Sequence, residues 1–250
     1  MLTAIRQQDS AKVCAWEAER EDKPFICHCC HETVTLRKGE IKAPHFAHQP
    51  PVTCEYGTGE GEAHRRCKIA IYEELINRQN VTKCEIERDL GTVRPDVSAY
   101  INGVPVAIEV QLSNLSLGKI KQRTAEYARK GIYVLWLPVY SRDLKKELYA
   151  PRPWELWLQE AYFGRVYYWL EGLKIQPVHF RDYYINVNGL THDYYKLSRR
   201  KVPIDGRTVM LTEDFSPVKS VAHGRSLTSV PQAKLFVDKQ QKWYSAARCD

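Results

Sequence analysis

The sequence predicts a mixed α/β fold built on a helix, a β-hairpin, a second helix and a buried strand between residues 60 and 140. Three observations predict it: helical periodicity from Gly61 to Leu75, an Asn-Gly pair between alternating β-formers, and an apolar run from Ile132 to Leu137. Helical and strand periods that follow one another in this order are typical of an α/β core.

The first helix carries an apolar stripe and two polar residues in line with it. The stripe consists of Ala63, Cys67, Ala70, Ile71 and Leu75. His64 and Lys68 continue one i, i+4 row of this stripe, so they lie on or beside the packing face. These two residues, and Glu62 at the start of the helix, are either boundary residues that reach toward water or members of a functional site.

The Asn102-Gly103 pair is the strongest short-range signal of a hairpin with a two-residue type I′ turn. This turn fixes the register and places Asp96 opposite Glu109. The same register places Arg94 opposite Gln111, and strand alternation puts all four side chains on one polar face. The other face is apolar and consists of Val97, Ala99, Ile101, Val104, Val106, Ile108 and Val110.

The second helix begins after Ser116, which is a typical N-cap residue, and ends near Gly131. Arg123 and Tyr127 lie four residues apart on one side of it. The apolar run that follows predicts a buried strand. We expect that strand to lie parallel to the second hairpin strand, through a right-handed crossover.

The two opposed carboxylates of the hairpin predict a metal site. Carboxylates directly opposite each other have Cβ atoms about 5 Å apart, and their like charges destabilise a sheet. A divalent cation held by Asp96 and Glu109 would reverse that repulsion. Hard oxygen ligands suit Mg²⁺ or Mn²⁺, which can activate water and neutralise charge on a phosphodiester. The alternative is a solvated polar face, and the pattern favours the metal.

Residues 26–56 are rich in cysteine and histidine. Cys27 and Cys30 form a C-x-x-C knuckle, and His45 and His48 form an H-x-x-H pair beyond a short predicted hairpin. This set predicts a structural Zn²⁺, which would let a module of about thirty residues fold. Free thiols and surface histidines are the alternative. Other residues close enough in sequence to act as ligands are His28, Cys29, His31 and Cys54.

The composition fits a folded soluble protein, with 250 residues of which 44% are hydrophobic and 27% charged. Residues 132–140, the most apolar run, are too few to span a bilayer, and the start has no signal-peptide pattern. We therefore expect no membrane contact and a cytoplasmic location. The net charge of +7 lies mainly after residue 195, where eleven Lys and Arg face five Asp and Glu.

Three further segments are open to more than one interpretation. Ser10–Arg20 is compatible with a helix. The aromatic segment Trp154–Phe180 predicts a helix and a hairpin packed on the core, with a base-stacking surface as the alternative. The basic tail, with Arg199-Arg200-Lys201, is either an electrostatic footprint for phosphates or a solubilising extension.

Several motifs occur in an order that resembles known nucleases. Pro95-Asp96 and Glu109-Val110-Gln111 are similar to the PD-(D/E)xK motif, with glutamine in place of lysine. The wider set is Phe25-Ile-Cys27-x-x-Cys30, Pro44-His45-Phe46-Ala47-His48, Glu62-x-His64-x-x-x-Lys68, Arg94-x-Asp96-Val97, Ile108-Glu109-x-Gln111-x-Ser113-x-x-Ser116 and Arg123-x-x-x-Tyr127. Together, over roughly residues 1–180, they resemble the competence protein CoiA family.

This resemblance implies a restriction-endonuclease-like α/β core. A zinc-binding N-terminal module would span residues 1–58, a nuclease-like domain 59–150, and an aromatic and basic C-terminal extension 151–250. The resemblance also implies DNA as the substrate, with single-stranded and branched forms among the candidates, and a recombinase as a partner. The process would be DNA uptake or recombination.

The resemblance further implies roles for individual residues. Asp96 and Glu109 would hold Mg²⁺ or Mn²⁺, and Glu62 or His64 would complete the catalytic site. Gln111 can orient a water or phosphate but carries no charge, so Lys68 or a lysine of the second helix would supply it. The candidates for DNA contact are Arg94, Ser113, Ser116, Arg123 and Tyr127, although Ser116 fits a helix cap better. The competing function is a catalytically inactive, zinc-containing nucleic-acid-binding protein.

Overall fold

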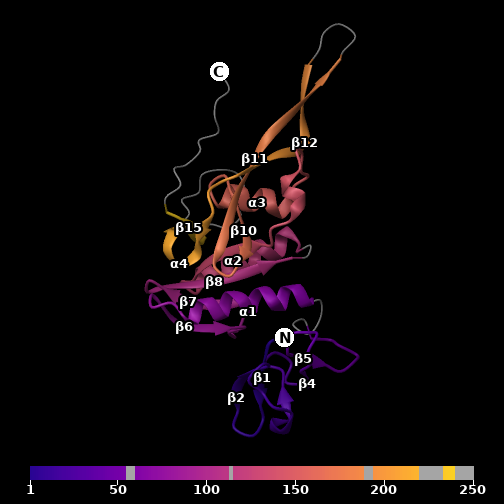
Figure 1. Ribbon diagram of the computed structural model, residues 1–250, viewed down its shortest axis with the longest axis vertical. Coiled ribbons are helices and arrows are strands. Elements are labelled where there is room, and N and C mark those ends of the chain that lie inside the picture. Colours follow the sequence, from indigo (N-terminus) through magenta and orange to yellow (C-terminus); the bar gives the residue numbers. More distant parts are fainter. Residues whose placement is uncertain (55–59, 113–114, 189–193, 220–232, 240–250) are drawn as a thin grey trace.

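The structure is a computed structural model that describes residues 1–54, 60–112, 115–188, 194–219 and 233–239. Ser113 lies outside these described residues. Figure 1 shows three sheets that follow one another along the long axis: a small N-terminal sheet at one end, a six-stranded sheet in the middle, and a third sheet at the other end. Part of the third sheet projects from the body as a two-stranded ribbon.

The N-terminal sheet has five strands in the order β2-β1-β3-β4-β5. Their bounds are β1 Thr3–Arg6, β2 Ala11–Cys14, β3 Phe25–Ile26, β4 Thr33–Arg37 and β5 His45–His48. The predicted hairpin between the two halves of the Cys/His segment is confirmed, because β4 and β5 pair antiparallel. Phe25 and Phe46 pack at the centre of a core of only ten buried residues. So small a core is typical of modules that a metal ion stabilises.

The helix expected over Ser10–Arg20 is wrong. Ala11–Cys14 forms β2, which pairs antiparallel with β1, and the only helical piece nearby in the described chain is the 3-10 turn η1 (Arg20–Asp22). Asp9 accepts hydrogen bonds from Arg6 and from the Ala11 amide, and so closes the turn between the two strands. Ladder pairing with a strand earlier in the chain has overridden the local helix propensity.

The central sheet has six strands in the order β14-β15-β9-β8-β7-β6. Their bounds are β6 Val81–Ile86, β7 Val97–Ile101, β8 Val104–Gln111, β9 Tyr133–Pro138, β14 Phe215–Lys219 and β15 Lys234–Asp238. The predicted parallel pairing of β9 with β8 is confirmed. The helix, hairpin, helix and strand therefore form one α/β unit in the expected order.

The hairpin register is as predicted from its turn. Val97 pairs with Ile108 and Ile101 with Val104. Asn102 and Gly103 both have positive φ, 51° and 77°, as a type I′ turn requires. The ladder stops at Val97, however, so the expected ladder pair of Asp96 with Glu109 does not form.

Helix α1 (Glu62–Ile76) packs against β6, β7 and β8, and helix α2 (Leu117–Arg129) packs against β9. The Ser116 hydroxyl accepts a hydrogen bond from the Lys119 amide, so the predicted N-cap is confirmed and explains this serine. The expected stripe of α1 is wrong at Ala63, which is exposed. The buried face includes Lys68, Ile71 and Leu75, so Lys68 of the predicted polar row is buried and His64 is half-buried.

The aromatic segment forms a helix and strands that pack on the core. The elements of this region are η3 Arg142–Lys145, α3 Pro153–Ala161, β10 Val166–Glu171, β11 Lys174–Val187, β12 Tyr194–Asp205, β13 Val209–Met210 and α4 Leu211–Asp214. Trp154, Trp157, Tyr162, Tyr167 and Tyr168 are all at most 4% exposed. The alternative of a base-stacking surface in this segment is therefore wrong, and the packing interpretation is confirmed.

The C-terminal region contributes to the central sheet. β15 pairs parallel with β9 and antiparallel with β14, so the six-stranded sheet draws on both sides of the boundary expected at residue 150. Among the described residues, none of the helices combines the length and the apolar character that crossing a bilayer requires.

Candidate functional site

Four acids lie close together where the start of α1, the end of β6 and the outer end of the hairpin meet. This acidic cluster consists of Glu60, Glu87, Asp96 and Glu109. Glu87 and Glu109 are 2% and 3% exposed. Buried carboxylates at this density require cations, because each isolated charge would cost several kcal/mol to desolvate.

Lys68 is the central cation of the cluster. Its ammonium forms ion pairs with Glu60, with Glu87 Oε1 at 2.5 Å and with Asp96 Oδ1 at 3.6 Å, and the residue is 3% exposed. Burial alone would lower the pKa of Lys68, but the three carboxylates around it raise the pKa above its ordinary value. Lys68 therefore carries its charge at neutral pH.

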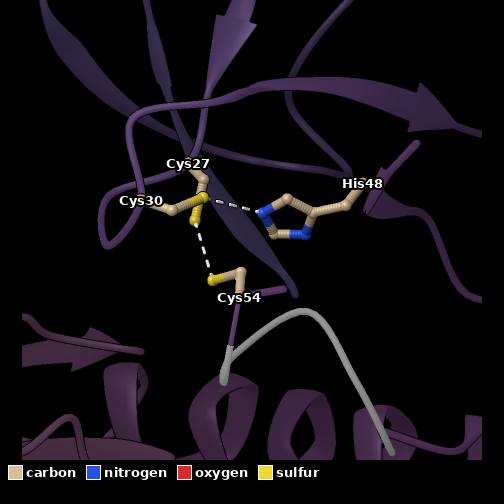
Figure 2. A group of neighbouring side chains, drawn as sticks. All are labelled: Cys27, Cys30, His48 and Cys54. Atoms are coloured by element: carbon tan, nitrogen blue, oxygen red, sulfur yellow. Dashed lines mark hydrogen bonds between the residues drawn. The ribbon is translucent and has the colours of Figure 1, made fainter. Parts of the chain in front are cut away.

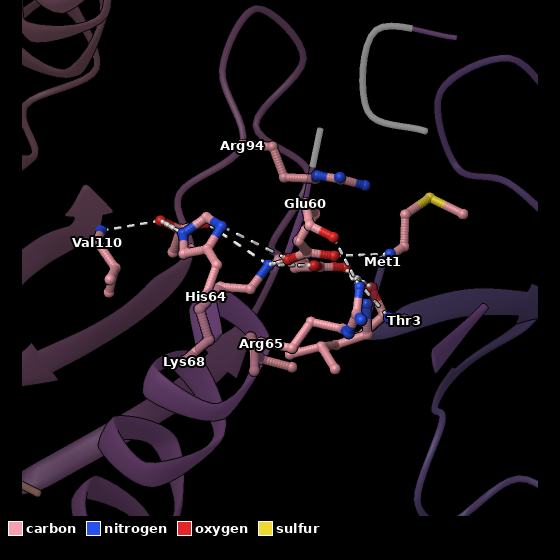
Figure 3. Close-up of polar contacts among 12 residues, drawn as sticks. Met1, Thr3, Glu60, His64, Arg65, Lys68, Arg94 and Val110 are labelled. Carbon is pink, nitrogen blue, oxygen red and sulfur yellow. Dashed lines mark hydrogen bonds and ion pairs between the residues drawn. The ribbon is translucent and has the colours of Figure 1, made fainter. Parts of the chain in front are cut away.

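The N-terminal sheet also contacts the cluster (Figure 3). The backbone amides of Leu2 and Thr3 donate to Glu87 Oε2 at 2.9 and 3.1 Å, and the Thr3 hydroxyl donates to the same oxygen at 3.1 Å. The Met1 amine lies 2.8 Å from Glu60 Oε2. The cluster thus joins the N-terminal sheet to α1 and the hairpin.

Asp96 connects α1 to the hairpin. His64 Nε2 lies 3.1 Å from Asp96 Oδ2, and the Val110 amide donates to the same oxygen at 2.8 Å. Burial would raise the pKa of Asp96, but the charges of His64 and Lys68 hold that pKa below its ordinary value. Burial would lower the pKa of His64, and Asp96 more than offsets this, so the net shift is upward. Both groups therefore favour their charged forms.

Glu109 contacts α2. The hydroxyl of Tyr127 and the Arg123 guanidinium both donate to Glu109 Oε1, and Arg123 also donates to the Arg94 carbonyl at 2.9 Å. Burial raises the pKa of Glu109 to about 7, although Arg123 opposes the rise. A bound divalent cation would favour the ionised form of such a carboxyl.

The structure therefore brings together most of the residues expected at the site. Asp96, Glu109, His64 and Lys68 meet in or around the cluster, with Arg123 and Tyr127 beside them. Gln111 is buried at the end of β8. Arg123 and Tyr127 both contact the Glu109 carboxylate, and their expected contact with DNA stays a prediction.

Glu62 is the exception. Its carboxylate accepts hydrogen bonds from the Ala43 amide and from Arg66, and so faces the N-terminal module rather than Asp96. The sequence reasoning missed Glu60 and Glu87. Glu60 lies four residues before His64, so extending the i, i+4 row by one step would have found it. Glu87 lies just beyond β6 and outside the motifs, and carried no such signal.

Asp96, Glu109 and Gln111 lie at the open end of the β7–β8 hairpin, which we call the hairpin edge. Their donor atoms suit a divalent cation. Asp96 and Glu109 offer hard carboxylate oxygens, and Gln111 offers an amide oxygen, which are ligands that Mg²⁺ and Mn²⁺ prefer. In the described structure Lys68, His64 and Arg123 also neutralise these acids. A bound ion would therefore share the two carboxylates with protein cations.

A second cluster lies in the N-terminal sheet and consists of Cys27, Cys30, His48 and Cys54 (Figure 2). The four ligand atoms lie within 4.8 Å of one another. Cys27 Sγ and Cys54 Sγ are 3.9 Å apart, close to the roughly 3.8 Å expected between two sulfurs on tetrahedral zinc. Burial raises the pKa of the Cys27 thiol to about 11, so only a cation would keep it as a thiolate at neutral pH. The cluster is compatible with zinc.

The fourth member of this cluster is Cys54 and not the predicted His45. His45 and His48 lie three residues apart in β5, so they point to opposite faces of the strand. His45 Nδ1 lies 2.9 Å from the Ala43 carbonyl oxygen, away from the cluster. An H-x-x-H pair presents both rings to one ion only where the backbone is helical or turns, and here it is extended.

Two family models match consecutive segments of the chain. Residues 7–57 match the family model "Competence protein CoiA, N-terminal domain", and residues 60–151 match "Competence protein CoiA, nuclease-like domain". The chain belongs to the CoiA-like family. The match to the nuclease-like domain includes the whole acidic cluster, and the match to the N-terminal domain includes all four residues of the Cys/His cluster.

One curated relative is Competence protein CoiA of Bacillus subtilis (strain 168), which is 29% identical over 119 residues. The matched segment covers 47% of this chain and 32% of the relative, so the chain spans about a third of that protein's length. No solved structure matches this chain. The recombinase partner stays a prediction, since neither the family descriptions nor the relative's name mentions one.

The Lys68→Met substitution is expected to lower the free energy of unfolding by about 3–5 kcal/mol, because it leaves buried carboxylates without their shared cation. Urea unfolding measures this, with Lys145→Met, an exposed lysine of η3, as the control. A double variant that also carries Glu87→Gln should recover part of the loss, because it removes one stranded charge. If Lys68→Met had the same free energy of unfolding as the wild type, Lys68 could not be the cation that stabilises these buried carboxylates.

Proposed function

We propose that this CoiA-like protein is a divalent-metal-dependent DNA nuclease that acts in DNA uptake or recombination. One observation carries the proposal: the buried Glu109 and the half-buried Asp96 lie at one end of the central hairpin, with the Lys68 ammonium 3.6 Å from Asp96, within the segment that matches a nuclease-like domain. Two carboxylates can hold a divalent cation that activates water for phosphodiester hydrolysis, and a nearby lysine can stabilise the negative charge that develops.

In this proposal Asp96, Glu109 and the amide oxygen of Gln111 hold Mg²⁺ or Mn²⁺. The ion supplies Lewis acidity and a water of lowered pKa. Lys68 holds Asp96 in place and adds the positive charge that Gln111 lacks. His64 keeps the second Asp96 oxygen oriented, and Tyr127 and Arg123 fix the Glu109 carboxylate from α2. Arg123 also adds positive charge near the place of an incoming phosphate.

The experiment is cleavage of labelled DNA by the purified, zinc-loaded chain. Single-stranded, duplex and branched substrates are incubated with Mg²⁺ or Mn²⁺, and with EDTA as the control. The proposal predicts products that require the added metal and that appear on at least one substrate. Intact DNA of all three forms under every metal condition would contradict it.

A second function, DNA binding by an inactive nuclease core, is favoured by one observation. Lys68, His64 and Arg123 already neutralise the acidic cluster, and glutamine stands where the motif has lysine. This alternative predicts DNA binding without cleavage, and binding that is independent of Mg²⁺. The same cleavage assay, run beside a binding titration, separates the two functions.

A further inference from the structure

The outer part of β11 and β12 projects from the protein as a two-stranded ribbon (Figure 1). We call residues 183–187 and 194–200 the ribbon arm. Within it Tyr184 pairs with Leu197 and Val187 with Tyr194. The other strands that pair with β11, β10 and β13, reach no further along it than Val178 in the described structure. Within the described part of the chain, no third strand therefore extends the arm, and Figure 1 shows it standing clear of the body.

The ribbon arm exposes tyrosines on both faces. Tyr184 and Tyr195 are 53% and 71% exposed and lie on one face, because Tyr195 pairs with Asn186, two residues along from Tyr184. Tyr194 is 52% exposed and lies on the other face, beside Ile185. An uncovered two-stranded ribbon is marginally stable in water, so apolar side chains on both faces indicate a binding surface.

The charge of this surface is positive. Arg181, Lys196, Arg199 and Arg200 are exposed, and residues 183–188 and 194–204 contain no acid. Asp182, at the base of the arm, is paired with Lys201 at 2.6 Å. Tyrosine rings flanked by exposed cations suit a partner with flat rings and regular negative charge, which is the chemistry of a nucleic acid.

The base of the ribbon arm lies beside the hairpin edge. The Val139 amide donates to the Gln111 carbonyl at 3.2 Å, and the next residue, Tyr140, donates its hydroxyl to Asp205 at the end of β12. The backbones of Tyr149 and Lys201 bond to each other in both directions. A strand held on the arm would therefore lead toward the end of β8 that carries Glu109 and Gln111.

We propose that the ribbon arm binds unpaired DNA, with bases stacked on its tyrosines and phosphates on its arginines and lysine. This inference rests on the proposed function for the identity of the nucleic acid as DNA. The tyrosines favour an unpaired strand, because the base faces in a duplex are already stacked on one another. A second copy of the chain, pairing through the arm, is the other occupant that the test examines.

Binding to a fluorescent thirty-nucleotide oligothymidine, measured by anisotropy, tests the proposal on the full chain. Since stacking on an aromatic ring contributes about 1–3 kcal/mol per base, Tyr184→Ala with Tyr195→Ala should weaken binding at least about tenfold. The matched control, Tyr184→Phe with Tyr195→Phe, keeps the rings and should bind like the wild type. Circular dichroism verifies that both double variants remain folded.

A second variant removes charge rather than rings. Arg199→Ala with Arg200→Ala should weaken binding and reduce its salt dependence, whereas Arg142→Ala with Lys145→Ala, on η3, should change neither. The same oligonucleotide annealed to its complement should bind the wild type more weakly than the single strand. Equal binding of the alanine and phenylalanine tyrosine variants would overturn the proposal, as would a wild type that prefers the duplex.

The outcomes separate this inference from the proposed nuclease function. If the alanine variants lose binding while the wild type never cleaves, DNA binding by the arm is supported and the nuclease function is contradicted. If the wild type cleaves and the alanine variants bind and cleave as well as the wild type, DNA binding by the arm is contradicted and the nuclease function is supported. A wild-type dimer in sedimentation that the alanine variant abolishes, without any binding of the oligonucleotide, would assign the arm to self-association instead.

Discussion

Replacing Asp96 by asparagine is expected to reduce metal-dependent DNA cleavage by about a thousandfold or more. Asparagine keeps an oxygen that can accept from the Val110 amide, so the hairpin edge should remain folded. It removes the negative charge that would hold a divalent cation, and each 1.36 kcal/mol lost from the transition state costs a factor of ten in rate. Glu109→Gln should act in the same direction, because Glu109 is the other carboxylate of the edge.

Single-turnover cleavage with Mn²⁺ measures this effect, and thermal unfolding verifies that the variants are folded. Asp143→Asn, an exposed acid of η3, is the matched control and should cleave like the wild type. Cleavage by Asp96→Asn at the wild-type rate would place the chemistry elsewhere. Loss of cleavage together with loss of folding would show that the substitution acted on stability, and Glu109→Gln would then decide the question.

Removing zinc is expected to unfold the N-terminal sheet. Zinc binding contributes on the order of 10 kcal/mol or more to small modules of this kind, and this sheet has only ten buried residues in its core. Cys54→Ser should lower the zinc content, whereas Cys29→Ser should not, because Cys29 is exposed and outside the cluster. Elemental analysis of freshly purified protein and near-ultraviolet circular dichroism measure both effects.

The loss of zinc should also weaken the acidic cluster. The amides of Leu2 and Thr3 hold Glu87, which in turn holds Lys68, so an unfolded N-terminal sheet removes three hydrogen bonds from a buried carboxylate. Cleavage by the zinc-free protein should therefore fall even when Mg²⁺ is present. A purified wild type that contains no zinc and retains a folded N-terminal sheet would contradict this account.

The elements predicted well from the sequence are those fixed by local chemistry. The Asn102-Gly103 turn determined a register that the backbone follows, and Ser116 marked the start of α2 by the hydrogen bond that it accepts. Of the Cys/His cluster, Cys27 and Cys30 are marked by a C-x-x-C knuckle, which is a local motif, and His48 is marked by the H-x-x-H pair. The H-x-x-H spacing was misleading for His45, because the pair lies in an extended strand that directs the two rings to opposite faces.

The features that the sequence did not reveal depend on contacts between distant residues. Residues 11–14 form β2 because they pair with β1, and β15 pairs with β9, which lies about a hundred residues earlier in the sequence. Glu87 is buried only because the N-terminal sheet and Lys68 meet there. The exposed tyrosines of the ribbon arm could not be told from the buried ones of β10, because both segments carry adjacent tyrosine pairs in alternating strands, and only the contacts with other elements decide which pairs are buried.

Binding of Mn²⁺ to the zinc-loaded protein tests most directly whether the hairpin edge is a divalent-metal site. Isothermal titration calorimetry of the wild type and of the Asp96→Asn, Glu109→Gln double variant compares the two under identical conditions. The account predicts one Mn²⁺ bound by the wild type and none at that site in the double variant. Equal binding by both proteins, or no binding by the wild type with or without DNA, would contradict it.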